Sequence, residues 1–210
     1  MKIAIVSLYD AAFSALTDIT FPSLREYCEK WGYATYFGEP FVGLDPRDTY
    51  NRFIIPYNLF LQENFDAVMW LDADAMITNH HIRIEDRLGD EKFVIASDLH
   101  GLNAGVFIVR NHVETRELFL SLINLGKKLT GEHPFREQEA LNRYLAFDHY
   151  KHIATVLPQR MMNSVVNAFY QRPPDFSGNW QPGDWILHFP GITLADRCRV
   201  APDFVSQIVR

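Results

Sequence analysis

Short apolar segments alternate with helical patterns along the first half of the chain, and this alternation limits the fold. Residues 3–8 and 67–71 are apolar runs of the kind found in strands buried on both faces. Parallel strands need a crossover, usually a helix, so the pattern predicts an α/β fold with a mainly parallel central sheet flanked by helices. We expect further strands at residues 33–37, 93–97, 105–109 and 185–189, and helices at 13–31, 48–64, 113–129, 135–147 and 202–210.

Glycine and proline positions predict where these elements end. Gly32 is expected to end the first helix, and Pro56 to kink or restart the second. Residues 158–184 are expected to be loop-rich because they contain several proline and glycine pairs. A chain of 210 residues fits a single domain with a sizeable core.

The formal net charge of -6 argues against nucleic acid or an anionic membrane surface as the main partner. A phosphate ligand would need a metal ion to offset the repulsion between acidic groups. The two cysteines, Cys28 and Cys198, are expected to be reduced thiols. The apolar run at the N-terminus is too short for a signal peptide, and no stretch approaches the roughly 20 apolar residues of a membrane span. We therefore expect a cytoplasmic protein.

Two carboxylates, Asp72 and Asp74, directly follow the apolar run at residues 67–71. Side chains two residues apart on an extended chain point to the same side, so the pair can converge. Such a pair repels unless a cation or proton joins it, and a hard divalent ion with oxygen ligands meets that need. The same ion can stabilise a departing diphosphate. Asp-x-Asp also occurs in solvated loops, but here apolar residues 75–77 follow, which favours a site.

His188 follows another apolar run and precedes a Pro-Gly turn. A strand there would present the imidazole at a strand end, where it could complete a metal site with Asp72 and Asp74. The alternative is a hydrogen-bonded structural histidine. Imidazole with two carboxylates suits Mn²⁺ somewhat better than Mg²⁺, which stays possible.

Five sequence blocks in order, residues 70–75, 102–111, 137–141, 167–169 and 183–191, resemble glycosyltransferase family 34. This family includes galactosyl/mannosyltransferases of fungi and xyloglucan xylosyltransferases of plants. The resemblance implies a GT-A fold with a Rossmann-like sheet, a nucleotide-sugar donor, a divalent metal and retention of anomeric configuration. It also implies a nucleotide-binding half at about residues 1–100 and an acceptor half at about 101–210.

The resemblance assigns roles residue by residue. Asp74 matches a direct metal ligand, Asp72 a ligand or a contact to the donor's ribose or sugar, and His188 the third protein ligand. Asn103 and Gly191 match positions beside the donor. Residues Glu137 and Gln138 match an acid/amide pair lining the reaction centre.

Four further residues are candidates on position alone. Ser7 and Tyr9 follow the first strand, where Tyr9 could stack on the nucleotide base or be an ordinary loop tyrosine. Arg52 could reach a phosphate or lie on a solvated helix face. Asp98 could contact donor-sugar hydroxyls, assist at the anomeric centre or simply form a turn. Three histidines, His80, His81 and His112, are expected at the surface without a role.

The sequence departs from the family pattern in places. Members are usually longer and anchored in the Golgi membrane, and they commonly carry a cysteine and then a lysine after the His-Phe-x-Gly motif. Here Ile192 follows the motif, and the nearest basic residues are Arg197 and Arg199. A bacterial or viral enzyme that builds a surface glycan therefore fits better than a polysaccharide-specific one.

The predicted function is a metal-dependent transferase that moves a hexose or pentose from a nucleotide sugar, with UDP favoured over GDP, onto a glycan acceptor. With no well-placed nucleophile evident, a front-face route is expected. A nucleotidyltransferase is an alternative, although residues 7–12 lack its Gly-rich basic loop. A phosphatase of the haloacid-dehalogenase type also uses an Asp-x-Asp motif after a strand, but it usually has Thr or Val at the position of Met76, which weakens that alternative. A non-catalytic glycan-binding module would explain the aromatic residues but not a metal triad.

Overall fold

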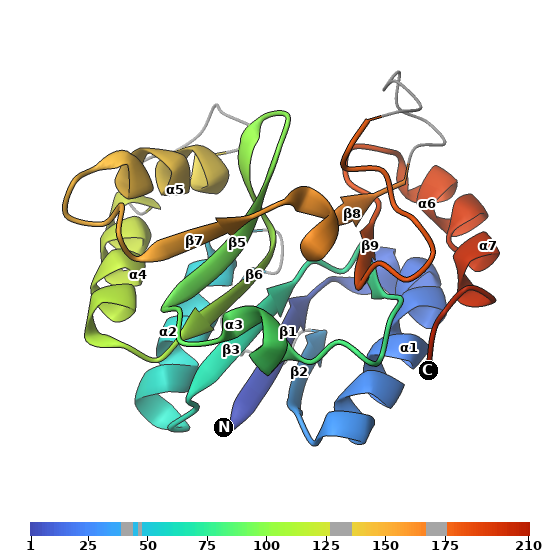
Figure 1. Cartoon of the computed structure of the whole chain (residues 1–210), viewed down its shortest axis with the longest axis horizontal. Coiled ribbons are helices and arrows are strands. Elements are labelled where there is room, and N and C mark those ends of the chain that lie inside the picture. The colour runs from blue at the N-terminus through green and yellow to red at the C-terminus, as the bar shows by residue number, and fades with distance from the viewer. Residues whose placement is uncertain (39–43, 46–47, 127–135, 167–175) are drawn as a thin grey trace.

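The structure is a computed structural model that describes residues 1–38, 44–45, 48–126, 136–166 and 176–210, with a six-stranded sheet at its centre (Figure 1). The strand order is β2-β1-β3-β6-β5-β7, and every strand except β6 runs in the same direction. The predicted α/β fold with a mainly parallel sheet is thereby confirmed. The strands are β1 (Ile3–Leu8), β2 (Ala34–Gly38), β3 (Ala67–Leu71), β5 (Phe93–Asp98), β6 (Gly101–Arg110) and β7 (Ala154–Leu157).

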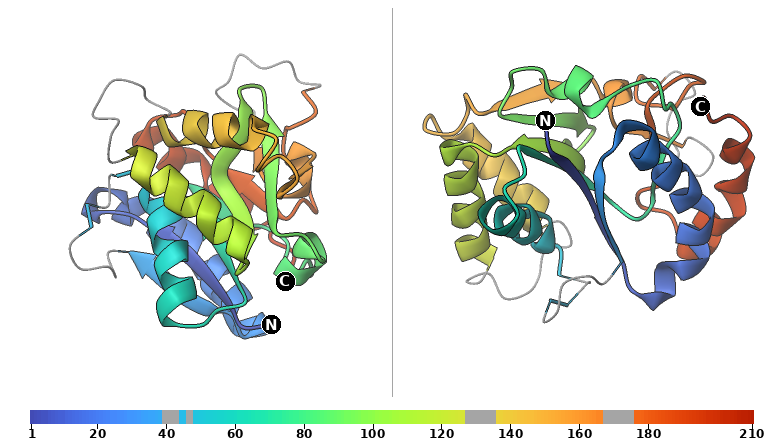
Figure 2. Two further views of the ribbon diagram at one scale, coloured as in Figure 1. Left: turned by 90° about the vertical axis from the view of Figure 1, so that its left-hand side faces the viewer. Right: turned by 90° about the horizontal axis from the view of Figure 1, so that it is seen from below.

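Helices cover both faces of this sheet (Figure 2). One face packs against α2 (Asn51–Gln62), α4 (Val113–Gly126) and α5 (Arg136–Ala146) through a cluster that includes Phe53 and Phe119. The other packs against α1 (Ser14–Trp31) and α3 (Ile84–Leu88). None of the described helices is both long and apolar enough to cross a membrane.

A small second sheet lies beside the carboxyl ends of β1 and β3 (Figure 1). It contains β4 (Ala75–Ile77), β9 (Ile186–His188) and β8 (Ser164–Val165) in the order β4-β9-β8. Apolar side chains of α6 (Leu194–Val200) and α7 (Pro202–Val205) pack against it. Pairing of β9 with β4, which follows β3 in the chain, thus brings the C-terminal part of the chain to the edge where ligands of α/β folds bind. The 3-10 helices are η1 (Ala11–Phe13) and η2 (Gln159–Met161).

Several sequence predictions are confirmed at residue level. The first and third strands have the predicted bounds, residues 3–8 and 67–71. Gly32 ends α1 in a left-handed conformation with φ of 71°, and its N–H donates to the Cys28 carbonyl. The second helix continues through Pro56 rather than restarting there. The end of the helix predicted at residues 113–129 and the start of the one predicted at 135–147 lie outside the described residues.

Several short elements were not predicted, and the extent of one predicted helix is wrong. The strand and helix pattern did not reveal β4, β7, β8, α3 or α6, which are too short for periodicity to show. The predicted helix at residues 202–210 ends at Val205. Beyond it Val209 forms a bridge with Asn79, accepting from the His80 N–H at 2.7 Å. Backbone pairing to another segment therefore replaces the end of that helix.

His80 is buried, with 2% of its surface exposed, which corrects its predicted surface position. Its Nε2 lies 2.8 Å from the Ser23 Oγ, and its ring packs on Tyr27 of α1. Burial lowers the pKa of His80 from its ordinary value. The other two histidines stay outside the core: His81 is exposed and His112 is half-buried.

Candidate functional site

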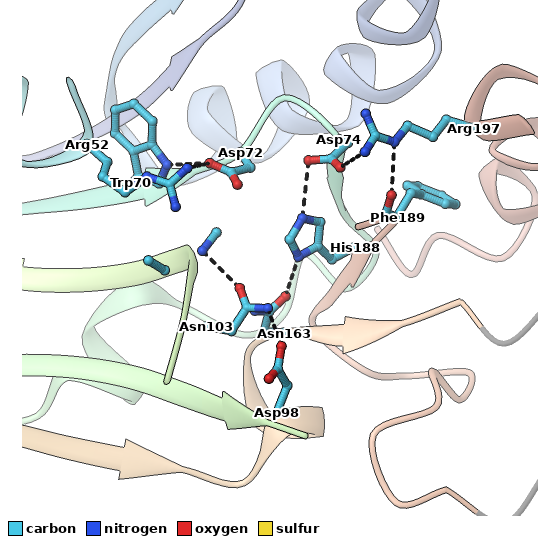
Figure 3. Close-up of polar contacts among 12 residues, drawn as sticks. Arg52, Trp70, Asp72, Asp74, Asp98, Asn103, Asn163, His188, Phe189 and Arg197 are labelled. Carbon is cyan, nitrogen blue, oxygen red and sulfur yellow. Dashed lines mark hydrogen bonds and ion pairs between the residues drawn. The ribbon is translucent and has the colours of Figure 1, made fainter. Parts of the chain in front are cut away.

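The Asp-x-Asp segment forms a tight turn between β3 and β4. The Asp72 N–H donates to the Gly105 carbonyl on β6 at 2.8 Å, and the Ala75 N–H donates to the Asp72 carbonyl at 2.9 Å. This turn points the carboxylates of Asp72 and Asp74 toward one region at the carboxyl end of the sheet (Figure 3).

The small sheet brings His188 to the same place. In the antiparallel pair β4–β9 the partner of His188 is Ala75, the neighbour of Asp74, and the Phe189 N–H donates to the Asp74 carbonyl at 2.9 Å. The His188 Nε2 lies 3.1 Å from the Asp74 Oδ1. Strand register therefore places residues that are distant in the sequence within contact distance.

One ligand atom from each of Asp72, Asp74 and His188 lies within 4.8 Å of the other two. An octahedral ion with bonds of about 2.1 Å spaces its ligands roughly 3 to 4.2 Å apart, so small side-chain movements would suffice. Gly105 makes room for the group, because a Cβ there would lie 2.5 Å from the His188 Cε1 and 3.0 Å from the Asp72 Oδ2. Two carboxylates and an imidazole suit Mn²⁺, and the residues present fit a divalent cation.

Two arginines already face the carboxylates (Figure 3). Arg52 of α2 lies 3.4 Å from the Asp72 Oδ1 and 3.2 Å from the Glu137 Oε1. Arg197 of α6 lies 2.9 Å from the Asp74 Oδ2. Three carboxylates thus share two guanidinium groups, which leaves negative charge for a further cation to offset.

The two aspartates differ electrostatically. Burial raises the pKa of Asp72, and this effect outweighs the opposing charge of Arg52. Burial would also raise the pKa of Asp74, but His188 and Arg197 outweigh it and lower the value to about 2. Asp74 is therefore ionised at neutral pH, whereas burial favours the protonated form of Asp72.

Two cavities meet at this cluster and share Thr49, Arg52, Asp72, Asp74 and Arg197 in their walls. The first, of about 290 Å³, extends toward the end of β1. The second, of about 310 Å³, extends toward the β5–β6 hairpin and α5. Besides the shared residues, the first is lined by Leu8, Tyr9, Asp10, Phe13, Asp48, Trp70 and Ala73.

The second cavity contains the other candidates for contact with a sugar. The Asn103 amide donates to the Asp98 Oδ2 at 2.7 Å, and its Oδ1 accepts from the Gly105 N–H at 2.9 Å. Gln138 of α5 accepts from the Ala104 N–H at 3.2 Å. The other Asp98 oxygen, Oδ1, accepts from the His100 N–H at 2.6 Å, as a turn-forming aspartate does. Its role at the donor sugar stays a prediction.

Some of the predicted site residues line the two cavities, and others do not. Tyr9 lines the first cavity and stacks edge-on against Phe21. Ser7, in contrast, lies inside β1 and is fully buried, so the expectation that it follows the strand is wrong. It is not among the residues that line either cavity. Gly191 lines the second cavity with a φ of 74°. The block at residues 167–169 lies outside the described residues.

Three residues of the site were not predicted from the sequence. Arg197 had been noted only as the nearest basic residue, yet it contacts Asp74. The Trp70 indole donates to the Asp72 Oδ1 at 2.6 Å. The buried Asn163 contacts the His188 Nδ1. Of these three contacts, the sequence offered a signal only for that of Trp70, which stands two residues before Asp72 and therefore on the same side of the strand.

A sequence profile of the galactosyl transferase GMA12/MNN10 family matches residues 88–199, more than half of the chain. The chain belongs to this family. The match confirms the resemblance to glycosyltransferase family 34 and includes His188, Arg197 and Asn103, although not the Asp-x-Asp segment.

Curated proteins are similar to this chain over part of their length. The probable alpha-1,2-galactosyltransferase gmh1 of Schizosaccharomyces pombe is 34% identical over 170 residues, which cover 62% of this chain and 49% of that protein. An alpha-1,2-galactosyltransferase of the same organism is 26% identical over 227 residues, covering 83% and 56%. The chain spans about half the length of the curated relatives it matches.

Solved structures share the fold of this GMA12/MNN10 family member. A glycosyltransferase involved in the glycosylation of the major capsid of PBCV-1 aligns with a TM-score of 0.71 at 20% identity, covering 96% of this chain and 98% of that one. The galactosyltransferase LgtC, solved with donor and acceptor sugar analogs, aligns with a TM-score of 0.53 at 13% identity, covering 98% and 95%. The predicted GT-A fold is confirmed, while the division into two halves stays a prediction.

Proposed function

We propose that this protein is a metal-dependent, retaining glycosyltransferase that transfers a sugar from a nucleoside diphosphate donor, UDP rather than GDP, to a glycan acceptor. The observation that carries the proposal is the position of Asp72, Asp74 and His188 where two cavities meet. Membership of the family and the names of its curated relatives favour galactose as the first donor sugar to test.

The cavity beside β1 is assigned to the nucleoside. It contains the Tyr9 ring, which offers a flat apolar surface for a base, and the Asp10 and Asp48 carboxylates, which accept hydrogen bonds. Gly38 lies next to Tyr9, since a Cβ there would come within 3.6 Å of the tyrosine ring. A base stacked at this position places the diphosphate beside Asp72 and Asp74.

The cavity beside the β5–β6 hairpin is assigned to the transferred sugar and the incoming acceptor. Asp98 and Asn103 form a hydrogen-bonded pair that can accept from and donate to sugar hydroxyls. Glu137, which is 4% exposed, is held by Arg52 and lies beside Gln138 in the wall. These side chains come from a strand end, a hairpin and a helix, so the sugar would be fixed from several directions.

Charge compensation links the two cavities. Arg52 and Arg197 each pair with one aspartate of the cluster. Asp72 and Asp74 would hold the divalent cation, and the guanidinium groups of Arg52 and Arg197 would then be free to bind the diphosphate, whose geometry they match. A bound divalent cation would supply electrostatic stabilisation of the charge that develops on the leaving diphosphate. The two arginines then add fixed positive charge from opposite sides.

The proposal is tested by incubating the protein with UDP-galactose and Mn²⁺ and measuring the release of UDP and galactose. We expect release that depends on Mn²⁺ and that Asp74→Ala abolishes. Full activity of Asp74→Ala, or activity that EDTA does not remove, would overturn the metal-dependent mechanism.

The same assay separates the proposal from its rivals. A nucleotidyltransferase would release pyrophosphate from UTP and galactose 1-phosphate, and a glycan-binding module would release nothing from any nucleotide sugar. With an oligosaccharide acceptor, NMR of the product gives the anomeric configuration, and the proposal expects an α-linkage from an α-linked donor. A β-linked product would overturn retention.

A further inference from the structure

Asn163 is a fully buried side chain beside the imidazole of His188. It lies between η2 and β8, and its N–H donates to the Gln159 carbonyl at 2.7 Å. The parallel pair β8–β9 aligns Val165 with His188, so the backbone fixes the distance between Asn163 and the ring. This contact is therefore built into the strand register.

The contact involves the ring nitrogen that faces away from the aspartates (Figure 3). The Asn163 Oδ1 lies 2.9 Å from the His188 Nδ1, whereas the Nε2 on the opposite side of the ring lies 3.1 Å from the Asp74 Oδ1. An amide oxygen only accepts hydrogen bonds, so this arrangement requires a proton on Nδ1. Without a cation, Nε2 can also carry a proton and donate it to the Asp74 carboxylate 3.1 Å away. With a cation on that carboxylate, the neutral ring that keeps its Nδ1 proton would have its lone pair on Nε2.

We propose that Asn163 is a positioning residue: its amide oxygen accepts the Nδ1–H of His188 and thereby presents Nε2 to the divalent cation. The inference rests on the proposed metal site. Ligating histidines generally donate their second N–H to a fixed acceptor, which sets the tautomer and the ring orientation. The lack of solvent at Asn163 makes this acceptor hard to replace with water.

The amide nitrogen adds a second argument. The Asn163 Nδ2 is buried and has no partner among the described residues. A buried unpaired donor is costly, so packing alone would favour an apolar residue of similar size here. An amide whose oxygen is needed by His188 explains why a polar side chain lies in this position.

Two substitutions separate the chemistry from the packing. Asn163→Leu keeps the volume and removes the acceptor, whereas Asn163→Asp keeps an acceptor oxygen at the same place. The matched control is Asn111→Leu, the same exchange at a half-buried asparagine that bonds the Phe65 carbonyl at the other end of the sheet. All variants are first compared by thermal unfolding to establish that they fold.

The experiment measures Mn²⁺ affinity by calorimetry and the His188 ring by ¹⁵N NMR with Mg²⁺ bound. We expect Asn163→Leu to lose about 10- to 100-fold in affinity, with Asn163→Asp recovering most of it and Asn111→Leu unchanged. The NMR spectrum of the wild type should show a protonated Nδ1 whose signal is lost or exchanges rapidly in Asn163→Leu.

Three results would overturn the proposal: two concern Asn163 alone, and the third concerns the metal site itself. Equal Mn²⁺ affinity of the wild type and Asn163→Leu, or a protonated Nε2 in the Mg²⁺-bound wild type, would remove the role of Asn163 and leave the metal site intact. A wild type that binds no Mn²⁺ would overturn the metal site and this inference together.

Discussion

Arg197 and Asp74 lie 2.9 Å apart at the boundary between the two cavities, and Arg197 also donates to the Phe189 carbonyl at 2.9 Å. Because this guanidinium occupies the carboxylate that a cation would bind, it competes with the cation and then becomes available to the diphosphate. Its position therefore links metal binding to donor binding.

Replacing the guanidinium should separate these two effects. Arg197→Gln is expected to weaken UDP binding in the presence of Mn²⁺ by about 10- to 100-fold, the usual value of hydrogen bonds to charged groups. Mn²⁺ affinity without nucleotide should stay the same or increase, because a competitor is gone. Calorimetry measures both quantities.

The control for that experiment is Arg199→Gln, on the same helix. Arg199 is exposed and pairs with Asp196, away from both cavities. Its replacement should change neither affinity. A loss of UDP affinity of the same size in both variants would show that only the net charge of α6 matters.

Gly105 should tolerate no side chain. A Cβ at this position would lie 2.5 Å from the His188 Cε1 and 3.0 Å from the Asp72 Oδ2. Gly105→Ala is expected to displace the ring, cost about 1–3 kcal/mol of unfolding free energy and abolish detectable Mn²⁺ binding. Denaturant unfolding and metal titration test this. An alanine variant that binds Mn²⁺ normally would contradict the conclusion that the metal site needs a glycine at position 105.

Much of the fold was predictable from the sequence because long buried strands leave a clear apolar pattern. The bounds of β1 and β3 were read directly, and the motif after β3 followed from its place at a strand end. In the small sheet, β9 lies within the strand predicted at residues 185–189, but β4 and β8 were not predicted, because they contain only three and two residues. Such elements take their structure from tertiary pairing rather than from local pattern.

Site residues were predictable where the residue type and its neighbours indicate chemistry. They were not predictable where only the tertiary fold brings a residue to the site. Asp72 and Asp74 were visible because carboxylates framed by apolar residues are unusual. Arg197 was not, because its helix begins at the Thr193 cap and is positioned by packing on β4 and β9. Asn163 depends entirely on the β8–β9 register, which no local pattern reveals.

The Glu114 carboxylate predicts a pH dependence of stability far from the site. Hydrogen bonds from Lys92 and His152 lower its pKa to about 2, from the ordinary value of 4.5. A lowered pKa in the folded state means that the contribution is present above pH 4.5 and is lost as the pH falls toward 2. The difference in unfolding free energy between the wild type and Glu114→Gln should therefore shrink over this range.

Denaturant unfolding measures that difference, at pH values about one unit apart, from pH 5 down to the lowest pH at which the protein folds. Glu117→Gln is the control, because it removes the same charge from an exposed position on α4. A gap between the wild type and Glu114→Gln that does not change with pH would contradict the assigned hydrogen bonds.

The two thiols should differ in reactivity. Cys28 is buried, and burial raises its pKa to about 12, whereas Cys198 is half-buried. Since the thiolate is the reactive form, Cys28 should react with a thiol reagent only after unfolding. Absorbance with such a reagent, on Cys198→Ser and Cys28→Ser separately, tests this. Rapid modification of native Cys198→Ser would show that α1 opens readily.

The central claim is that Asp72, Asp74 and His188 hold a cation that in turn holds a nucleoside diphosphate. Calorimetric titration of UDP into the protein, with and without Mn²⁺, tests it most directly, with Asp74→Asn as the isosteric variant. We predict that UDP binds the wild type tightly only with Mn²⁺ and that Asp74→Asn loses this dependence together with most of the affinity. Equal UDP affinity with and without Mn²⁺, or an Asp74→Asn variant that keeps the metal dependence, would contradict the account.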